Sequence, residues 1–369
     1  MASHRMAPVV MSLVRGRAFV DFRSPPMSTL DPITPREALE MYCNDIDGEL
    51  SPNSVQAKRY QLGFFVDWCE GADNDETARV ENLNEITGRD FTRFKNWRSD
   101  GINKVTLRTN LSALRTFMRF CVSIDAVDPS IPEKINVPTL DYGENERETF
   151  LSHERATTIR AYLRKFQYAS LKHVLFTLQW HTGVRMSALH SLDVEDFDYE
   201  QETIRLRHRP DTDTRLKNGE AGNRLVTIDT ETAAVVDDYI EHKRTPATDE
   251  YGRHPLFSSS KGGRMSKSHL NKHMYRLTVP CEYGQPCPAD KDPQDCEYAG
   301  TFRDFIKCPH NVRPHDVRRG SITHWLRNDV PEKAVSDRMD VSVKTIDKHY
   351  DKRSEDERAE VRRQYLNEV

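Results

Sequence analysis

The segment from Arg313 to Leu326, RPHDVRRGSITHWL, gathers side chains that could act on a phosphate. Pro314 suits the first turn of a helix, where backbone N–H groups and the helix dipole already favour an anion. His315 and Arg318 are three residues apart and therefore share one face of that helix. A histidine can move a proton and a guanidinium can hold two oxygens, so the pair suits a phosphate undergoing displacement. His-x-x-Arg also occurs by chance, and a surface ion pair is the alternative.

Three further segments carry side chains of the same kind. HTGVRMSALHSLDVEDFD places Arg185 after a glycine and before a predicted helix. RLKNGEAGNRLV places Lys217 in a predicted hairpin, and SVKTIDKHYDKRS places Tyr350 in a polar segment near the C-terminus. Each has a structural alternative. Arg185 could pair with an acidic residue between positions 193 and 198, Lys217 could be an ordinary turn lysine, and Tyr350 could pack its ring against a C-terminal helix.

Arginine, lysine, His-x-x-Arg and tyrosine occur here in an order that resembles the tyrosine recombinase, or phage integrase, family. The resemblance is to its Xer-like members, of an archaeal type, and covers nearly the whole chain from about residue 31. Its most specific parts are TGVRMSALHSLDVEDFD, PHDVRRGSITHWL and the segment around Tyr350. It implies a mostly α-helical fold with a small β-sheet, made of an N-terminal helical, SAM-like core-binding domain and an α+β catalytic domain.

The resemblance gives each of these residues a role. Tyr350 would be the nucleophile that attacks a DNA phosphodiester, giving a covalent 3′-phosphotyrosine and a free 5′-hydroxyl. Arg185 and Arg318 would hold the non-bridging oxygens and stabilise the charge of the transition state. His315 would hydrogen-bond the phosphate and assist proton transfer, and Lys217 would protonate the departing 5′ oxygen. Catalysis would need no cofactor, because the protein linkage conserves the energy of the broken bond.

The implied function is that of a site-specific DNA recombinase, or integrase. It would work as a homotetramer on two double-stranded DNA sites and exchange strands through a Holliday junction. Two alternatives stay open: a DNA-relaxing enzyme like the type IB topoisomerases, and a non-catalytic, zinc-braced DNA-binding regulator on a decayed integrase fold. The expected location is the cytoplasm, at the nucleoid.

Two positions depart from the family's pattern. Nine residues before its tyrosine the family usually has a histidine or tryptophan, whereas this chain has Val341, which cannot donate a hydrogen bond to a phosphate. His349 is a poor substitute because its spacing is wrong. Three residues after its first arginine the family often has a glutamate, and here Ala188 stands instead. Ala188 weakens the resemblance more than the chemistry, while Val341 puts one phosphate contact in doubt.

The composition of the chain limits which partners and locations these interpretations allow. The net charge of −4 and the pI near 6.4 argue against nucleic acid when charge is judged globally, but local placement matters more. The sequence lacks an apolar run of about 18 residues, so we expect no membrane partner. An odd count of seven cysteines fits a reducing cytoplasm better than a disulfide framework.

The N-terminal part is predicted to be helical. Residues 1–30 are expected to be a disordered arm, or to reflect a start codon placed too early, with Met27 as the first residue. Residues 31–128 form the expected core-binding domain, with N-caps at Ser51 and Thr87. A third helix carries an apolar seam and, on another face, cations that could touch DNA; an ordinary solvated face is the alternative. The seam is Leu107, Leu111, Leu114, Met118 and Cys121, and the candidate DNA-binding residues are Lys104, Arg108, Arg115 and Arg119, with Arg319 in the catalytic domain.

Residues 129–149 read as a linker, because they contain three prolines, have no periodicity and end in a charged run. The catalytic domain is expected over residues 150–369. Its sequence predicts helices in LSHERATTIRAYLRKF and LKHVLFTLQWHTG, the second ending at Gly183, and another in TETAAVVDDYIEHK. The strands ETIRLRHRP and NRLVTID are predicted to flank the segment DTDTRLKNGEAG, in which Asn218 and Gly219 favour a tight turn.

A cysteine-rich insertion, residues 281–308, precedes the His-x-x-Arg segment. Its loops are rich in proline, aspartate and glycine and offer little apolar surface. They therefore need an internal cross-link, such as a bound metal, to stabilise them. Four thiolates could form a closed tetrahedral zinc site, with His310 as a possible replacement for one of them. Independent buried cysteines are the alternative, since the spacing has no Cys-x-x-Cys pair. The predicted ligands are Cys281, Cys287, Cys296 and Cys308.

Overall fold

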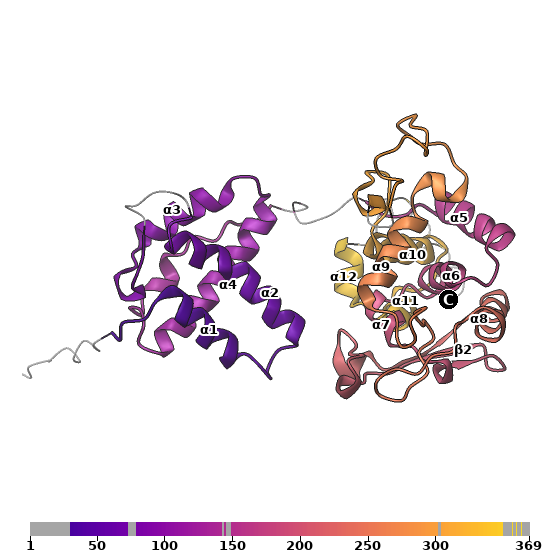
Figure 1. The fold of residues 1–369 in the computed structure, drawn as a ribbon, viewed down its shortest axis with the longest axis horizontal. Helices are drawn as coiled ribbons and strands as arrows, with labels where there is room; N and C mark the ends of the chain where they lie inside the picture. The colour runs from indigo at the N-terminus through magenta and orange to yellow at the C-terminus, as the bar shows by residue number, and fades with distance from the viewer. Residues whose placement is uncertain are drawn as a thin grey trace, which may run out of the picture. The chain divides into compact units, whose positions relative to one another are not determined.

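The computed structural model describes residues 30–72, 79–141, 144, 149–301 and 304–349, together with residues 356, 359 and 363. The chain divides into two compact units, residues 1–145 and 146–369 (Figure 1). Tyr350 and most of the predicted N-terminal arm, residues 1–29, lie outside the described residues. Within the described part of the chain, none of the helices is both long enough and apolar enough to cross a membrane.

The N-terminal unit is helical. Its described helices are α1 (Pro35–Asp45), α2 (Pro52–Cys69), α3 (Gly88–Ser99) and α4 (Lys104–Ser123), with two short 3-10 turns, η2 (Leu83–Glu85) and η3 (Ile131–Lys134). The predicted caps are confirmed. The Ser51 hydroxyl accepts a hydrogen bond from the Ser54 N–H at 3.3 Å, and the Asp90 carboxylate accepts one from the Thr87 N–H at 2.8 Å. Such contacts satisfy backbone groups that a helix end leaves without a partner.

The core of this unit is rich in aromatic side chains. Trp68, Phe94 and Phe117 are at most 1% exposed, and all five residues of the predicted apolar seam on α4 are buried. Ile131 and Ile135, which fall in the predicted linker, also belong to this core, at 3% and 0% exposed. The prolines of that segment prevent a long helix, but its isoleucines still supply apolar surface that packs. The first part of the predicted linker is therefore a structured part of the N-terminal unit.

The C-terminal unit combines helices with a small sheet, as predicted. Its helix α6 (Leu171–Thr182) packs against five others, and every residue from His173 to Trp180 is buried (Figure 1). Four of them are long, and the fifth is the short helix α7 (Met186–Ser191). The long helices around it are α5 (His153–Phe166), α8 (Thr230–His242), α9 (Lys267–Leu277) and α10 (Pro314–Arg327). Three shorter helices also lie in the described part of this unit: α7 (Met186–Ser191), α11 (Glu332–Met339) and α12 (Val343–His349).

The sheet has three antiparallel strands in the order β1 (Phe197–Asp198), β2 (Thr203–Leu206) and β3 (Arg224–Thr227). Ile204 pairs with Val226, and both side chains are buried. The predicted strands flank the predicted turn segment, in which the Gly219 N–H bonds to the Leu216 carbonyl at 3.2 Å. The two strands are joined by residues 207–223, which contain the 3-10 turns η5 (Pro210–Thr212) and η6 (Gly219–Gly222). Gly219 turns the chain within this loop, at a φ of +58°.

Helix α10 lies very close to the start of the C-terminal unit. A Cβ atom on Gly320 would be 2.1 Å from the Leu151 carbonyl oxygen and 3.0 Å from the Trp180 ring. The next residue, Ser321, donates a hydrogen bond to the Trp180 carbonyl at 2.5 Å. Only glycine permits this approach, so Gly320 fixes the depth at which α10 packs.

Gly320→Ala should therefore destabilise the protein by about 1–3 kcal/mol or more, because the added methyl forces backbone apart. The measurement is urea-induced unfolding of the whole chain followed by tryptophan fluorescence, since both units contain tryptophans. Gly63→Ala in α2 is the matched control, since a Cβ there would meet no atom within 4 Å. That control should be neutral or stabilising, by up to about 1 kcal/mol, through helix propensity. Equal stability of the two variants would contradict the packing argument.

Candidate active site

Helix α10 begins at Pro314, as predicted, and carries His315 and Arg318 in its first turns. The start of the helix is held from α6, because the Gln179 side chain donates a hydrogen bond to the Pro314 carbonyl at 3.0 Å. The hydrogen bond fixes the backbone at the start of α10, which carries His315 and Arg318, against α6.

Arg318 ties three segments of the site together. Its guanidinium is buried, at 1% exposed, and its Nη1 donates to the Gly183 and Met339 carbonyls, at 2.8 Å each. Its Nη2 lies 3.4 Å from the Asp340 carbonyl. Gly183 ends α6 in the left-handed region, at a φ of +60°, and a Cβ there would lie 2.5 Å from the Met339 sulfur. The ends of α6 and α11 thus meet at this buried charge, which these carbonyl dipoles offset.

Arg185 is the N-cap residue of α7, two residues after Gly183. Its Nη1 forms an ion pair with the Asp340 carboxylate at 2.5 Å, and its side chain is 28% exposed. Its acidic partner therefore lies beyond α11 and not between positions 193 and 198, where the sequence suggested one. The carboxylates of that segment, Asp193 and Asp196, pair instead with arginines that brace the sheet region, namely Arg209, Arg253 and Arg264.

Lys217 is exposed in the loop between β2 and β3. The neighbouring Asn218 places this loop at the site, because its Nδ2 donates to the other Asp340 carboxylate oxygen at 2.6 Å. Sequence reasoning missed both Asp340 and Asn218. The available signal was the aspartate immediately before Val341 in RMDVSV, since a carboxylate beside a predicted phosphate site needs a cation as partner.

The environment of His315 is electropositive. Withdrawal from water, followed by the positive charges of Arg318 and Arg319, lowers the pKa of His315 below its usual value of 6.5, and Arg185 adds to the effect. The residue as a whole still presents part of its surface to solvent. Because the pKa is lowered, the imidazole is neutral at pH 7 and can accept a proton.

Val341 does not supply the hydrogen-bond donor that a histidine or tryptophan at this position would offer to a phosphate. It is 6% exposed and belongs to an apolar cluster with residues of α10, α11 and α12, which include Leu326, Met339 and Ile346. This cluster docks α12, which ends at His349, the residue before Tyr350. Position 341 thus contributes packing. Tyr350 and the His349 side chain lie outside the residues that the structure describes.

The candidate DNA-binding cations of α4 all contact the segment that follows the helix. Lys104 pairs with Glu144 at 2.7 Å, and Arg119 pairs with Glu133 at 3.2 Å. Arg108 donates to the Pro138 carbonyl at 3.0 Å, and the half-buried Arg115 donates to the Ile135 carbonyl. Exposed pairs of this kind contribute little to stability, so they do not prevent a phosphate contact. Arg319 is 8% exposed and lies 3.8 Å from Asp316, away from open solvent.

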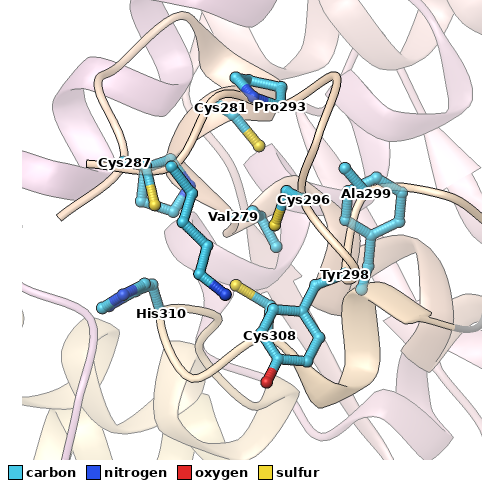
Figure 2. Close-up of a pocket in the computed structure, with 12 residues that line it drawn as sticks. Val279, Cys281, Cys287, Pro293, Cys296, Tyr298, Ala299, Cys308 and His310 are labelled. Atoms are coloured by element: carbon cyan, nitrogen blue, oxygen red, sulfur yellow. The ribbon is translucent and has the colours of Figure 1, made fainter. Parts of the chain in front are cut away.

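The four cysteines of the insertion line one small cavity. Its volume is about 20 Å³, near that of a single water or ion, and Figure 2 shows the four sulfur atoms around this common space. Lys291 and His310 also line it. Among the described residues, however, no three or more His, Cys, Asp or Glu side chains stand in an arrangement that could hold a metal ion. The predicted ligands are thus neighbours, without a formed metal centre.

Sequence comparison identifies the family to which this fold belongs. The model of the phage integrase family matches residues 149–357, and the chain belongs to that family. It is similar to the tyrosine recombinase XerC of Chlamydia trachomatis serovar L2, with 20% identity over 234 residues, which are 63% of this chain and 62% of that protein. The chain therefore spans less than two thirds of the length of the curated relatives it matches.

Two solved structures share the fold. The Tn1549 transposon integrase, in complex with a circular intermediate DNA, is 15% identical with a TM-score of 0.62 over 88% of this chain and 99% of that one. A lambda integrase dimer bound to a core site is 11% identical with a TM-score of 0.56 over 90% of this chain and 78% of that one. These likenesses confirm the predicted fold class of a mostly helical chain with a small sheet.

His315 should titrate below pH 6.5 in NMR spectra of the imidazole, for the reasons given above. Arg185→Gln should move its pKa upward, because one repulsive charge is removed while the carboxylate of Asp340 remains. Arg207→Gln, an exposed arginine beside Asp196, is the control and should leave the pKa unchanged. Titration at or above 6.5 in the unmodified protein would overturn this description of the site.

Proposed function

We propose that the protein is a site-specific DNA recombinase, or integrase, that cleaves and rejoins double-stranded DNA through Tyr350. The observation that carries the proposal is the convergence of Arg185, Arg318 and the loop bearing Lys217 on residues 339–340, with His315 in the electric field of both arginines. A phage integrase domain that keeps all of these candidate catalytic residues supports an active enzyme over a non-catalytic regulator. It also supports a recombinase over a DNA-relaxing topoisomerase.

In the proposed reaction the Tyr350 oxygen forms a bond to the scissile phosphorus and the bond to the 5′ oxygen breaks. His315, neutral at pH 7, assists removal of the phenolic proton, and Lys217 gives a proton to the departing 5′ oxygen. Arg185 and Arg318 stabilise the charge on the non-bridging oxygens. The reverse attack by a 5′-hydroxyl rejoins the strand and frees the tyrosine, so the cycle consumes no cofactor.

Strand exchange between two duplexes needs four cleavage events, so we propose a homotetramer on two DNA sites with a Holliday junction as intermediate. The structures of the Tn1549 integrase with a circular intermediate DNA and of a lambda integrase dimer on a core site support DNA as the partner. The proposed location is the cytoplasm, at the nucleoid, where such a substrate is found.

The test is covalent capture of DNA from the source organism. Protein is incubated with fragmented genomic DNA and denatured, and the DNA that remains attached is sequenced. The wild-type protein should retain one recurrent sequence, and Tyr350→Phe should reduce the yield by at least about 10³-fold, because the nucleophile is lost. Tyr251→Phe, at an exposed tyrosine outside the site, is the control and should retain the wild-type yield. Specific binding without an adduct would instead favour a non-catalytic regulator.

We further propose that the insertion binds one structural zinc ion through Cys281, Cys287, Cys296 and Cys308. Support comes from their shared cavity and from the small apolar cluster that otherwise holds this segment, which is built on Val279, Phe305 and Cys308. Four thiolates are a favoured zinc donor set, and binding would draw the sulfurs together. The ion would stabilise the loops that precede α10 and take no part in the chemistry.

Metal analysis of the purified protein tests this site. We expect about one zinc per chain, in line with a closed four-thiolate site. Cys296→Ser should lower that content several-fold, and a chelator should lower the melting temperature of the wild-type protein. Cys43→Ala, in the N-terminal unit, is the control and should keep the metal. Metal-free wild-type protein whose melting is insensitive to chelator would exclude the zinc site.

A further inference from the structure

The carboxylate of Asp340 bridges two segments that the proposed reaction uses separately. One oxygen accepts from Arg185 Nη1 at 2.5 Å, and the other accepts from Asn218 Nδ2 at 2.6 Å. Asn218 directly follows Lys217. A single side chain therefore contacts the arginine that would hold the phosphate and the loop that carries the proposed proton donor.

The position of this carboxylate is fixed by its backbone. Asp340 caps α11 in the left-handed region, at φ 53° and ψ 59°, with its N–H bonded to the Ser336 carbonyl. Aspartate and asparagine are the residues other than glycine that adopt this conformation most readily. The Asp340 side chain is 16% exposed, and the preceding carbonyl, of Met339, accepts from the buried Arg318. The backbone that carries the Asp340 carboxylate is therefore fixed by its contact with Arg318, the second proposed catalytic arginine.

The end of the loop that precedes β3, at Gly222, also packs beside the Asp340 carboxylate. A Cβ on Gly222 would lie 3.2 Å from Leu216 and 3.8 Å from the Asp340 Oδ2 atom. Leu216 is itself buried at 6% exposed. Residues 216–222 therefore close over Asp340, and Lys217 lies in the part of the loop that is held at both ends.

The ion pair leaves Arg185 able to bind a phosphate. Only its Nη1 is bonded to Asp340, and among the described residues its Nη2 and Nε make no hydrogen bond. An arginine can use its remaining donors on a second anion while one edge is held by a carboxylate. This arrangement orients the guanidinium, and it differs from a carboxylate that fills the phosphate position.

We propose that Asp340 is a positioning residue that couples Arg185 to the Lys217 loop, so that phosphate binding and proton donation are assembled together. The inference rests on the proposed recombinase function. It assigns Asn218 to the same device, as the contact through which Asp340 sets the position of Lys217.

Asn218 and Asp340 offer a reciprocal test. Asn218→Asp places two carboxylates in contact and breaks the link by repulsion. Asp340→Asn alone keeps both hydrogen bonds, because the Asn218 amide can turn to accept, and asparagine tolerates the backbone conformation. The double variant exchanges donor and acceptor, so the amide introduced at position 340 donates to the carboxylate introduced at position 218. Repair of Asn218→Asp by Asp340→Asn is the expected signature of the coupling.

The catalytic readout uses the captured DNA site with its scissile 5′ oxygen or with sulfur in that position. A thiolate leaves without a proton because its pKa is near 8.5, so the sulfur substrate does not need Lys217. Asn218→Asp should slow adduct formation on the oxygen substrate by about 10-fold, as a displaced proton donor would. On the sulfur substrate the loss should be at most about 2-fold, since only proton donation is impaired. Lys217→Ala should give the same pattern, and the double variant should return most of the lost rate.

Equal losses on both substrates would reduce Asn218 to a structural role and overturn the proposal. A faster reaction in Asp340→Asn would also overturn it, because the carboxylate would then compete with the phosphate. A second readout is independent of DNA: hydrogen exchange in residues 207–223 should accelerate several-fold in Asn218→Asp and recover in the double variant. If wild-type protein forms no adduct, the proposed function fails, while this exchange pattern still decides whether the coupling exists.

Discussion

The buried guanidinium of Arg318 is the interaction on which the rest of the site depends. It joins the carbonyl of Gly183, at the end of α6, to that of Met339, at the end of α11. Arg185 follows the first of these residues and Asp340 follows the second, so their ion pair is a consequence of where Arg318 holds the chain. A charge buried to this degree is stable only when such dipoles surround it, and losing them would expose an uncompensated cation.

Two glycines make that anchor possible. Gly183 turns the chain out of α6 and leaves room for the Met339 sulfur, while Gly320 lets α10 approach the carbonyl of Leu151. Larger residues at either point would shift α6, α10 or α11 relative to one another. Because catalysis tolerates little misplacement of its groups, these close backbone approaches bear directly on the proposed chemistry.

Sequence patterns predicted the elements that local rules determine. Helix caps at Ser51 and Thr87, the stop at Gly183 and the start at Pro314 follow from backbone hydrogen bonding, and the apolar seam of α4 follows from its periodicity. The order of the candidate catalytic side chains likewise indicated the family. Partners separated by more than a hundred residues were not predictable, as with the pairing of Arg185 with Asp340 and of Asn218 with the same carboxylate. The turn in the loop between β2 and β3 was also predictable, because an Asn-Gly pair is a common turn signal.

The N-terminal unit supplies its own counter-ions. Arg36, Arg59, Lys104 and Arg119 each pair with a carboxylate of the same unit, on surfaces open to solvent. A duplex that approaches these cations displaces protein carboxylates as well as small ions, so fewer free salt ions are released for each phosphate contact. The proposed affinity of this unit for DNA of arbitrary sequence is correspondingly low. The proposed DNA partner would bind it tightly only where the shape of the duplex allows many such exchanges at once.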